Sequence, residues 1–215
     1  MEDNKTKPTL LKCVVLGSSN VGKTSLLTKF VHGKFSEERR ATTGADFASK
    51  VLKLGDGNEV RLVIWDTAGQ ERFHHGTLGA AFYRGADGAL LVYDTTDIRT
   101  FEQIEMWRGE LLQRVEAPGD FPVVVVGNKI DLPSETRDQE QTAVMTWCRD
   151  LGIGLVNTSA KDGTGVDAAM EAIAALALEN RRRRDARASQ APREPSAFTL
   201  DTLDRRDSTS SSCCK

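Results

Sequence analysis

Long hydrophobic runs, a disulfide framework and a strong net charge are all missing from this sequence of 215 residues. No apolar run reaches the ~18 residues that a membrane-spanning helix needs, and the polar start of the chain lacks the apolar region of a signal peptide. Cys13 and Cys148 fall in apolar surroundings and are expected to be buried, whereas Cys213 and Cys214 are adjacent. This usage of cysteine excludes a disulfide scaffold and fits a reducing compartment. A net charge of −2 gives no indication of nucleic-acid binding.

The distribution of charge separates a folded domain from a tail. Residues 180–215 contain nine Lys/Arg and five Asp/Glu, a balance of +4, while the preceding part has 20 basic and 26 acidic residues, a balance of −6. After about Asn180, proline, scattered charge and a Ser/Thr-rich run are typical of disorder. We therefore predict an N-terminal extension (1–8), one domain (9–180) and a disordered tail (181–215). The arginines at 181–184 either attract anionic lipid or continue the last helix as a solvated end.

A glycine-containing loop lies between an apolar run and a helical pattern near the start of the domain. Residues 10–16 are apolar, residues 17–25 have the spacing G-x-x-x-x-G-K-[ST], and apolar residues then recur at helical spacing to about His32. A strand, a glycine turn and a helix in this order form a phosphate-binding loop, in which backbone N–H groups and the helix dipole attract an anion. Lys23 is placed to reach the outer phosphates, and the hydroxyl of Thr24 to ligate Mg²⁺. The phosphate-binding residues predicted here are Ser19, Asn20, Val21, Gly22, Lys23, Thr24 and Ser25.

Strand-like runs alternate with helical patterns along the rest of the domain. The further strands are predicted at 46–54, 60–65, 89–93, 123–126 and 155–156, and the further helices at 100–115, 136–151 and 166–179. The turn signal at 55–58 predicts a hairpin between the second and third strands. The predicted fold class is α/β, with a six-stranded, mostly parallel sheet, one antiparallel edge strand and helices on both faces. Sites in such sheets lie at the carboxyl ends of the strands.

An aspartate ends the third predicted strand and is followed by a glycine three residues later. A carboxylate at the position of Asp66 can hold Mg²⁺ through a water molecule. The N–H of Gly69 has no side chain beside it and can approach a third phosphate. The alternative is that Asp66 caps a helix.

Two further motifs each follow a strand and favour guanine as the base. In Asn128-Lys129-Ile130-Asp131, the carboxylate of Asp131 can accept hydrogen bonds from N1–H and the exocyclic amine of guanine. Adenine lacks this pair of donors, so an ATP-binding site is disfavoured. In Ser159-Ala160-Lys161, a backbone N–H can meet the guanine carbonyl, and Lys161 can brace the base.

The four motifs in this order resemble the Ras-like small GTPases, and within them the Rab branch. Residues 65–73 match the Rab pattern residue for residue, as do residues 82–86. Residues 43–47, 35–36 and 147–148 resemble most closely the late-endosomal and vacuolar Rab subfamily. The resemblance covers about residues 9–180 and implies the three-layer P-loop GTPase fold.

The resemblance also implies roles that spacing alone does not give. Residues 35–44 correspond to the first switch and 66–84 to the second; Thr42 ligates Mg²⁺, Phe35 packs edge-on to the guanine ring, and Gln70 orients the attacking water. The implied activity is that of a GTP/GDP switch that hydrolyses GTP slowly and is accelerated by a GTPase-activating protein. No arginine finger in cis is evident, so intrinsic hydrolysis is expected at about 10⁻⁴ to 10⁻³ s⁻¹. The departures at Thr43, Arg39 and Arg40 leave open a second hypothesis, a nucleotide-bound scaffold without useful hydrolysis. The unusual pair His74 and His75 is either a pair of solvated loop histidines or a metal- or pH-sensing site.

The terminal cysteine pair resembles the Rab signal for double geranylgeranylation of Cys213 and Cys214. Two lipid chains give stable anchoring where one gives only reversible binding. The implied partners are an exchange factor, an activating protein, a Rab escort protein, a GDP-dissociation inhibitor and effectors that read the switches, with the chain itself a monomer. The implied location is the cytoplasmic face of late endosomes, lysosomes or a vacuole, with a cytosolic pool, and the implied process is vesicle trafficking and fusion.

Overall fold

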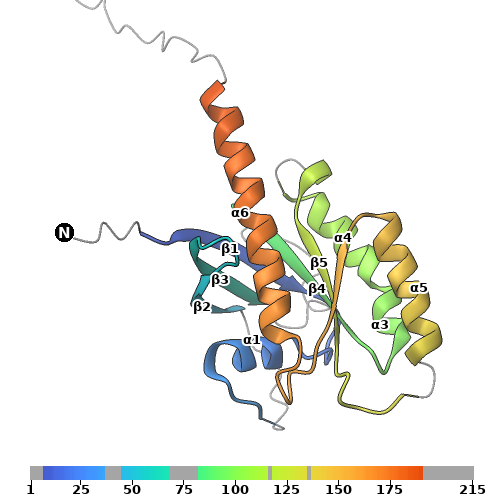
Figure 1. Cartoon of the computed structure of the whole chain (residues 1–215). Helices are drawn as coiled ribbons and strands as arrows, with labels where there is room; N and C mark the ends of the chain where they lie inside the picture. Colours follow the sequence, from blue (N-terminus) through green and yellow to red (C-terminus); the bar gives the residue numbers. More distant parts are fainter. Residues whose placement is uncertain (1–6, 37–44, 68–81, 116–117, 135–136, 191–215) are drawn as a thin grey trace, which may run out of the picture.

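The computed structural model describes residues 7–36, 45–67, 82–115, 118–134 and 137–190 (Figure 1). Along these residues the chain alternates strands with helices, as the sequence predicts. The elements are β1 Thr9–Leu16, α1 Lys23–His32, β2 Ala45–Lys53, β3 Glu59–Thr67, β4 Gly88–Asp94, α3 Ile98–Glu102, α4 Ile104–Leu112, the 3₁₀ helix η2 Pro118–Asp120, β5 Val123–Asn128, α5 Arg137–Asp150, β6 Gly154–Asn157 and α6 Val166–Gln190.

The six strands form one sheet in the order β2-β3-β1-β4-β5-β6. All neighbours in this sheet are parallel except the edge pair β2 and β3, which are antiparallel. In their hairpin the N–H of Leu54 donates to the carbonyl of Asn58 and the N–H of Gly57 to the carbonyl of Leu54, and Gly57 takes a φ of +84° that favours glycine. The predicted fold class, including the single antiparallel edge strand, is confirmed.

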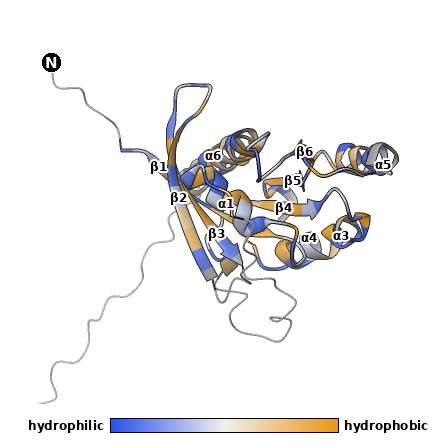
Figure 2. Cartoon of the chain, turned by 90° about the horizontal axis from the view of Figure 1, so that it is seen from below, coloured by the Kyte–Doolittle hydropathy of each residue, from blue (hydrophilic) through white to orange (hydrophobic). Residues whose placement is uncertain are grey.

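The central strands β1, β4 and β5 supply side chains to two separate hydrophobic clusters. In β1, Cys13 and Val15 face a cluster with α1 and α6, while Val14 and Leu16 face a cluster with α4 and α5. In Figure 2, α6 and α4 lie on opposite sides of the sheet, and β4 is hydrophobic until its hydrophilic carboxyl end. Helices therefore cover both faces, as predicted. Cys148 is also buried, and both described cysteines are free thiols.

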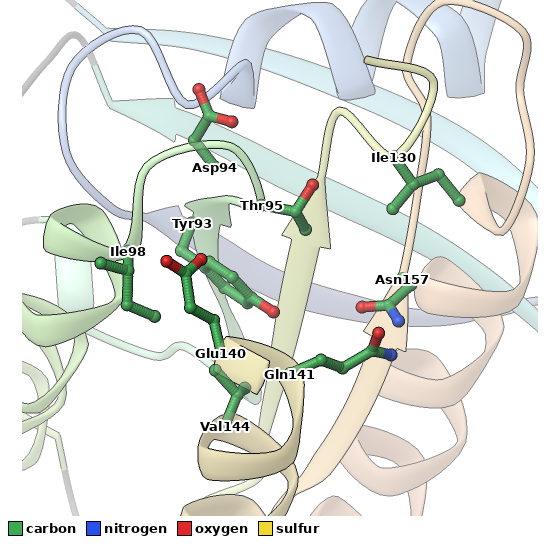
Figure 3. A pocket seen from close by; sticks show the side chains of 9 residues that line it. All are labelled: Tyr93, Asp94, Thr95, Ile98, Ile130, Glu140, Gln141, Val144 and Asn157. Carbon is green, nitrogen blue, oxygen red and sulfur yellow. The ribbon is translucent and has the colours of Figure 1, made fainter. Parts of the chain in front are cut away.

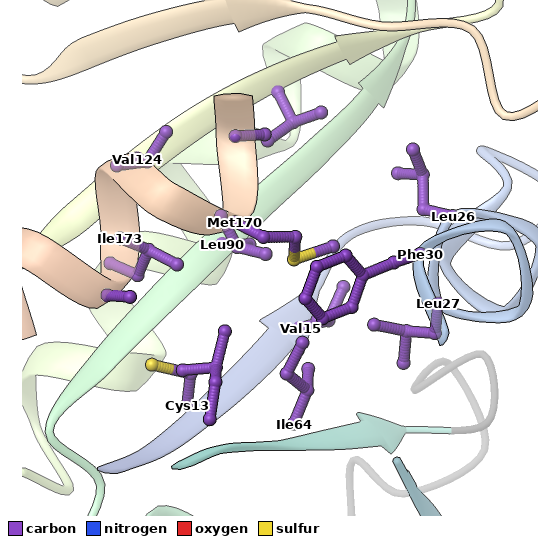
Figure 4. Close-up of a cluster of buried hydrophobic side chains, with 14 of the residues drawn as sticks. Cys13, Val15, Leu26, Leu27, Phe30, Ile64, Leu90, Val124, Met170 and Ile173 are labelled. Carbon is purple, nitrogen blue, oxygen red and sulfur yellow. The ribbon is translucent and has the colours of Figure 1, made fainter. Parts of the chain in front are cut away.

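Phe30 lies at the centre of the contacts between α1 and the sheet. Figure 4 shows its ring among side chains from β1, β3 and α6, including Val15, Ile64 and Met170. The residue is 3% exposed, and burial of a side chain of this size stabilises the fold by about 1.5–3 kcal/mol. Because α1 follows the glycine loop directly, this packing also fixes where the loop ends.

The predicted helix over 100–115 is interrupted. Helices α3 and α4 are separated by Gln103, whose N–H donates to the carbonyl of Phe101, so the regular ladder of helical hydrogen bonds stops there. Among the described helices, none is both long enough and apolar enough to cross a membrane.

The last helix is longer than the sequence predicts. α6 continues to Gln190 instead of ending near Asn180, because Arg181 and Arg184 form ion pairs with Asp87, which lies just before β4 and is 1% exposed. Of the two interpretations of residues 181–184, continuation of the helix is the one observed. The prediction that regular structure stops at residue 180 is wrong, and the remainder of the tail from 191 lies outside the described residues.

Candidate functional site

The predicted site residues meet at the carboxyl ends of the parallel strands. The loop after β1, the end of β3, the loop after β5 and the loop after β6 come together there. Hydrogen bonds join these four segments directly, between Thr24 and Asp66, between Asn128 and Val21, and from the loop after β6 to the loop after β5. The motifs thus form one connected unit, although they are up to about 140 residues apart in the sequence.

The glycine loop has a backbone that only glycine tolerates at its two ends. Gly17 has a φ of +141°, and a Cβ added there would lie 2.1 Å from the carbonyl oxygen of Val92. Gly22 has a φ of +97°, and a Cβ there would lie 2.3 Å from Nδ2 of Asn128. Asn20, between them, is also left-handed, with a φ of +63°. Side-chain-free glycines therefore let the loop pack against β4 and the loop after β5.

Lys23 is the first residue of α1 and turns back over the loop. Its Nζ donates to the carbonyl oxygens of Gly17 and Ser18, both at 2.7 Å, and the residue is 6% exposed. A buried ammonium held by carbonyl groups places a positive charge at the mouth of the loop. This is an arrangement suited to an anion.

Thr24 and Asp66 form the polar pair next to this loop. The hydroxyl of Thr24 donates to Oδ2 of Asp66 at 2.5 Å, and Asp66 is 2% exposed. Its Oδ1 is buried and has no hydrogen-bond partner in the described part of the chain. Burial raises the pKa of the Asp66 carboxyl, and the hydrogen bond from Thr24 opposes this rise. A buried carboxylate oxygen left unsatisfied is a candidate for contact with a hydrated cation.

Metal binding here would depend on few protein ligands. Within the described residues no cluster of three or more His, Cys, Asp or Glu side chains is suited to hold a metal ion. Mg²⁺ commonly keeps several waters and uses one or two protein oxygens together with substrate phosphates. The pair of Thr24 and Asp66 fits that description.

Asn128 is the hub that joins three of the motifs. Its Nδ2 donates to the carbonyl of Val21 at 2.8 Å, and its Oδ1 accepts from the hydroxyl of Thr158 at 3.1 Å and from the N–H of Ala160 at 3.2 Å. Asn128 is 1% exposed. All of these contacts are with protein, so in this structure the amide of Asn128 connects the loops around the site.

The residues predicted to recognise the base lie beside this hub. Asp131 is exposed, and its Oδ1 accepts from the hydroxyl of buried Ser159 at 2.8 Å. That bond orients the carboxylate while leaving it accessible. The carbonyl of exposed Lys161 accepts from Nζ of Lys29 at 3.3 Å, so α1 also contacts the loop after β6.

One charged residue at the site was missed by the sequence analysis. Nζ of Lys129 donates to Oδ2 of Asp94 at 2.5 Å, and Asp94, the last residue of β4, is 8% exposed. The signal that could have found it is the same one that pointed to Asp66. Both are aspartates that lie at the carboxyl end of an apolar strand.

Several predicted residues are not among those brought together. Phe35 follows α1 and is 37% exposed. Thr42, Gly69, Gln70, Cys213 and Cys214 lie outside the described residues, as do the departures Arg39, Arg40, Thr43, His74 and His75.

A small hollow adjoins the site, and Asp94 and Ile130 are among the residues that line it. Figure 3 shows side chains from the end of β4, from α5 and from β6 around it. Its walls include Tyr93 and Val144, which belong to the cluster beneath α4 and α5. None of the predicted nucleotide-binding residues lines it. Thr95 Oγ1 and Asn157 Oδ1 are buried on its wall without hydrogen-bond partners in the described part of the chain, as expected where ordered water completes the bonding.

Comparison with known proteins agrees with this geometry. The model of the Ras family matches residues 12–179. The chain is 49% identical over 181 residues to Ras-related protein RABG3a of Arabidopsis thaliana, covering 82% of this chain and 86% of the relative. It is 47% identical over 181 residues to Ras-related protein Rab7 of Glycine max, with the same coverage. It is 45% identical over 177 residues to the Ypt/Rab-type GTPase ypt7 of Schizosaccharomyces pombe, covering 81% and 85%.

The fold and the connected loops define a nucleotide-binding protein with a phosphate-binding loop, of the GTPase class. The chain belongs to the Ras family, and within it to the Rab7-type GTPases. It is therefore a GTP-hydrolysing enzyme that binds GTP and GDP, and this confirms the resemblance drawn from the motifs.

Proposed function

We propose that this Rab-type GTPase acts as a GTP/GDP switch in membrane traffic at late endosomes, lysosomes or a vacuole, and that the connected loops are its nucleotide site. The observation that carries the proposal is the set of hydrogen bonds that joins the glycine loop, Asp66, the loop after β5 and the loop after β6. Such bonds hold the phosphate-binding and base-binding segments in one register, which a ligand contacting both ends requires.

The phosphates are held by the glycine loop in this proposal. The loop supplies backbone N–H groups, and the ammonium of Lys23 supplies a positive charge close to Gly17. Thr24 and Asp66 would hold Mg²⁺, with Thr42 as a further ligand from the first switch. When bound, Mg²⁺ neutralises charge on the phosphates of the nucleotide.

The base is recognised at the opposite end of the same unit. Asp131, oriented by Ser159, accepts from the two N–H donors of guanine, and the N–H of Ala160 lies in the adjoining loop. Asn128 holds these segments together, and Lys129 and Lys161 flank the base. Phe35 covers the base from the loop after α1.

Hydrolysis depends on positioning more than on covalent chemistry. Gln70 orients the attacking water, and Gly69 contacts the γ-phosphate through its N–H. Since no arginine of the chain is assigned to the transition state, an activating protein supplies that charge. Loss of the γ-phosphate releases the switches, and effectors read this difference.

Membrane attachment follows from geranylgeranylation of Cys213 and Cys214. A Rab escort protein presents the chain for this modification, and a GDP-dissociation inhibitor maintains the cytosolic pool. An exchange factor loads GTP at the membrane. The names and identities of the relatives support the late-endosomal assignment.

The test of the nucleotide site is a change of base preference. Asp131→Asn is expected to bind xanthosine diphosphate and to lose GDP affinity by at least about tenfold, because the amide presents a donor where guanine also has a donor. Asp56→Asn, in the exposed hairpin between β2 and β3, is the matched control and should bind GDP as the unaltered protein does. Unchanged GDP affinity of Asp131→Asn would remove the base assignment.

A further inference from the structure

We propose that Asp94 is a positioning residue for the nucleotide: it holds Lys129 in place beside the base and thereby slows nucleotide release. The inference rests on the proposed nucleotide site. It adds to that site a residue that lies outside the four motifs.

The sheet itself brings the two residues together. β4 and β5 are parallel, and in their register Asp94 lies opposite Asn128, the residue before Lys129. The N–H of Thr95, after Asp94, donates to the carbonyl of Asn128 at 2.9 Å. The hydrogen bond from Nζ of Lys129 to Oδ2 of Asp94, at 2.5 Å, therefore joins two chain segments that backbone hydrogen bonds already hold together.

The carboxylate of Asp94 is oriented before it meets the lysine. Its Oδ1 accepts from the N–H of Thr96 at 2.9 Å and from the hydroxyl of Thr96 at 2.7 Å, and its own N–H donates to Oγ1 of Thr100 at 2.9 Å. One oxygen is thus engaged by the loop after β4. The other, Oδ2, is directed to Lys129.

Lys129 needs such a partner because of its backbone. It has a φ of +70°, one of two positive values among the described non-glycine residues. A left-handed conformation is unfavourable for a residue with a side chain, so surrounding contacts must maintain it. The pair is shielded from solvent, with the side chain of Lys129 22% exposed and that of Asp94 11% exposed, and a charge-assisted hydrogen bond is strong in such surroundings.

The carboxylate of Asp94 lies at the edge of the neighbouring hollow and is turned toward Lys129. Figure 3 shows it pointing away from Tyr93, Glu140 and Gln141. Asp94 also lines the hollow, but both of its carboxylate oxygens are engaged elsewhere, Oδ2 by Lys129 and Oδ1 by Thr96. Ordering Lys129 in advance removes part of the cost of ordering it when the base binds.

The experiment measures the dissociation rate of a fluorescent GDP analogue from the full chain. Asp94→Asn keeps the shape and the bond from Thr96 but removes the negative charge. It is expected to release GDP about 10- to 100-fold faster, the usual effect of losing a hydrogen bond to a charged group. Asp87→Asn is the matched control, because Asp87 is also buried but lies at the other end of β4 and pairs with Arg181. It should leave the GDP release rate unchanged.

A double variant separates positioning from general loosening. If Asp94 acts through Lys129, then Asp94→Asn combined with Lys129→Ala releases GDP no faster than Lys129→Ala alone. Effects of the two changes that multiply would overturn the inference, since Asp94 would then act independently of the lysine. If Lys129→Ala speeds release but Asp94→Asn does not, the inference fails and the proposed site stands. If Lys129→Ala itself has no effect, the assignment of Lys129 to the site fails.

A milder variant covers the case in which Asp94→Asn does not fold. Thr96→Val leaves Asp94 and Lys129 in place and removes only the hydroxyl that orients Oδ1. GDP release several-fold faster than in the unaltered protein is expected. An unchanged rate in a folded Thr96→Val protein would overturn the inference.

Discussion

The hydroxyl of Thr24 donates a 2.5 Å hydrogen bond to Oδ2 of Asp66, and this bond joins the first turn of α1 to the end of β3. It leaves Oδ1 of Asp66 buried without a hydrogen-bond partner in the described part of the chain. One oxygen of the Asp66 carboxylate therefore has a structural role, while the other is available to a hydrated cation.

Asp66→Asn is expected to weaken Mg²⁺ binding to the GDP-bound protein by about 10- to 100-fold, as for other groups that act on a metal through its water. Mg²⁺ affinity is measured by titration while GDP release is followed. Asp56→Asn, in the exposed hairpin between β2 and β3, serves as the control. Mg²⁺ dependence that survives Asp66→Asn would contradict the assignment.

The same residue predicts a pH dependence in the metal-free protein. Burial raises the folded-state pKa of Asp66 above the ordinary value of 3.8, so the stability that this group contributes is greatest below pH 3.8 and is lost as the pH rises through the folded pKa. Asp66→Asn should remove this loss. The measurement is thermal unfolding with the metal chelated. As the pH is raised from about 4 toward 7, the unfolding temperature of Asp66→Asn should increase relative to that of the unaltered protein.

Asn128→Ala should destabilise the protein by about 2–4 kcal/mol, because it leaves the buried groups of Val21, Thr158 and Ala160 without their partner. Urea denaturation gives the change in the free energy of unfolding. Asn58→Ala, in the hairpin, is the matched control and should cost less than about 1 kcal/mol. Equal effects of the two substitutions would show that Asn128 is not a hub.

Gly17→Ala should prevent correct closure of the glycine loop. The added Cβ would lie 2.1 Å from a backbone oxygen, and we expect a loss of about 3 kcal/mol or more together with loss of GDP binding. Gly109→Ala, in α4, meets nothing within 4 Å and should instead stabilise by about 0.5–1 kcal/mol. Thermal unfolding and GDP binding of the two variants provide the comparison.

Arg181→Ala should destabilise the domain by about 1–2 kcal/mol, a discounted value because its side chain is 39% exposed while its partner Asp87 is 1% exposed. Arg183→Ala is the control, since it loses only a surface pair with Glu179 and should cost at most about 0.5 kcal/mol. A chain ending at Asn180 should also unfold at lower urea concentration than one ending at Gln190. Equal midpoints would mean that the extension of α6 contributes nothing.

Single-turnover hydrolysis should be slow, about 10⁻⁴ to 10⁻³ s⁻¹, and should rise by several orders of magnitude with a Rab-directed activating protein. Gln70→Leu should abolish that stimulation while leaving GTP binding intact. Hydrolysis that no activating protein stimulates would favour the scaffold hypothesis, in which the nucleotide is only a structural ligand.

The alternation of strands and helices, the antiparallel edge strand and the position of the motifs followed from local pattern. Apolar runs, the glycine loop and the hairpin signal at 55–58 depend on neighbouring residues, and the fold confirms them. The rule that sites lie at the carboxyl ends of parallel strands then placed the described motif residues on one edge of the sheet.

Features that depend on distant partners were not predictable in the same way. The helix beyond Asn180 is polar, and its stability comes from Asp87, which lies 94 residues before Arg181. The role of Asp94 depends on the register of β4 with β5, which the sequence does not give. In the first case the ion pair of Arg181 with Asp87 extends a helix that the local sequence does not favour. In the second, the ion pair of Asp94 with Lys129 forms only once the strands are paired.

The ion pairs between α6 and Asp87 have a mechanical consequence. Because Arg181 and Arg184 hold the helix at the beginning of β4, tension on the tail enters the domain there. Asp94, which pairs with Lys129, is the last residue of the same strand, about 20 Å away at the usual rise of a strand. Force applied to the tail would therefore reach first the end of β4 that lies opposite the candidate nucleotide site.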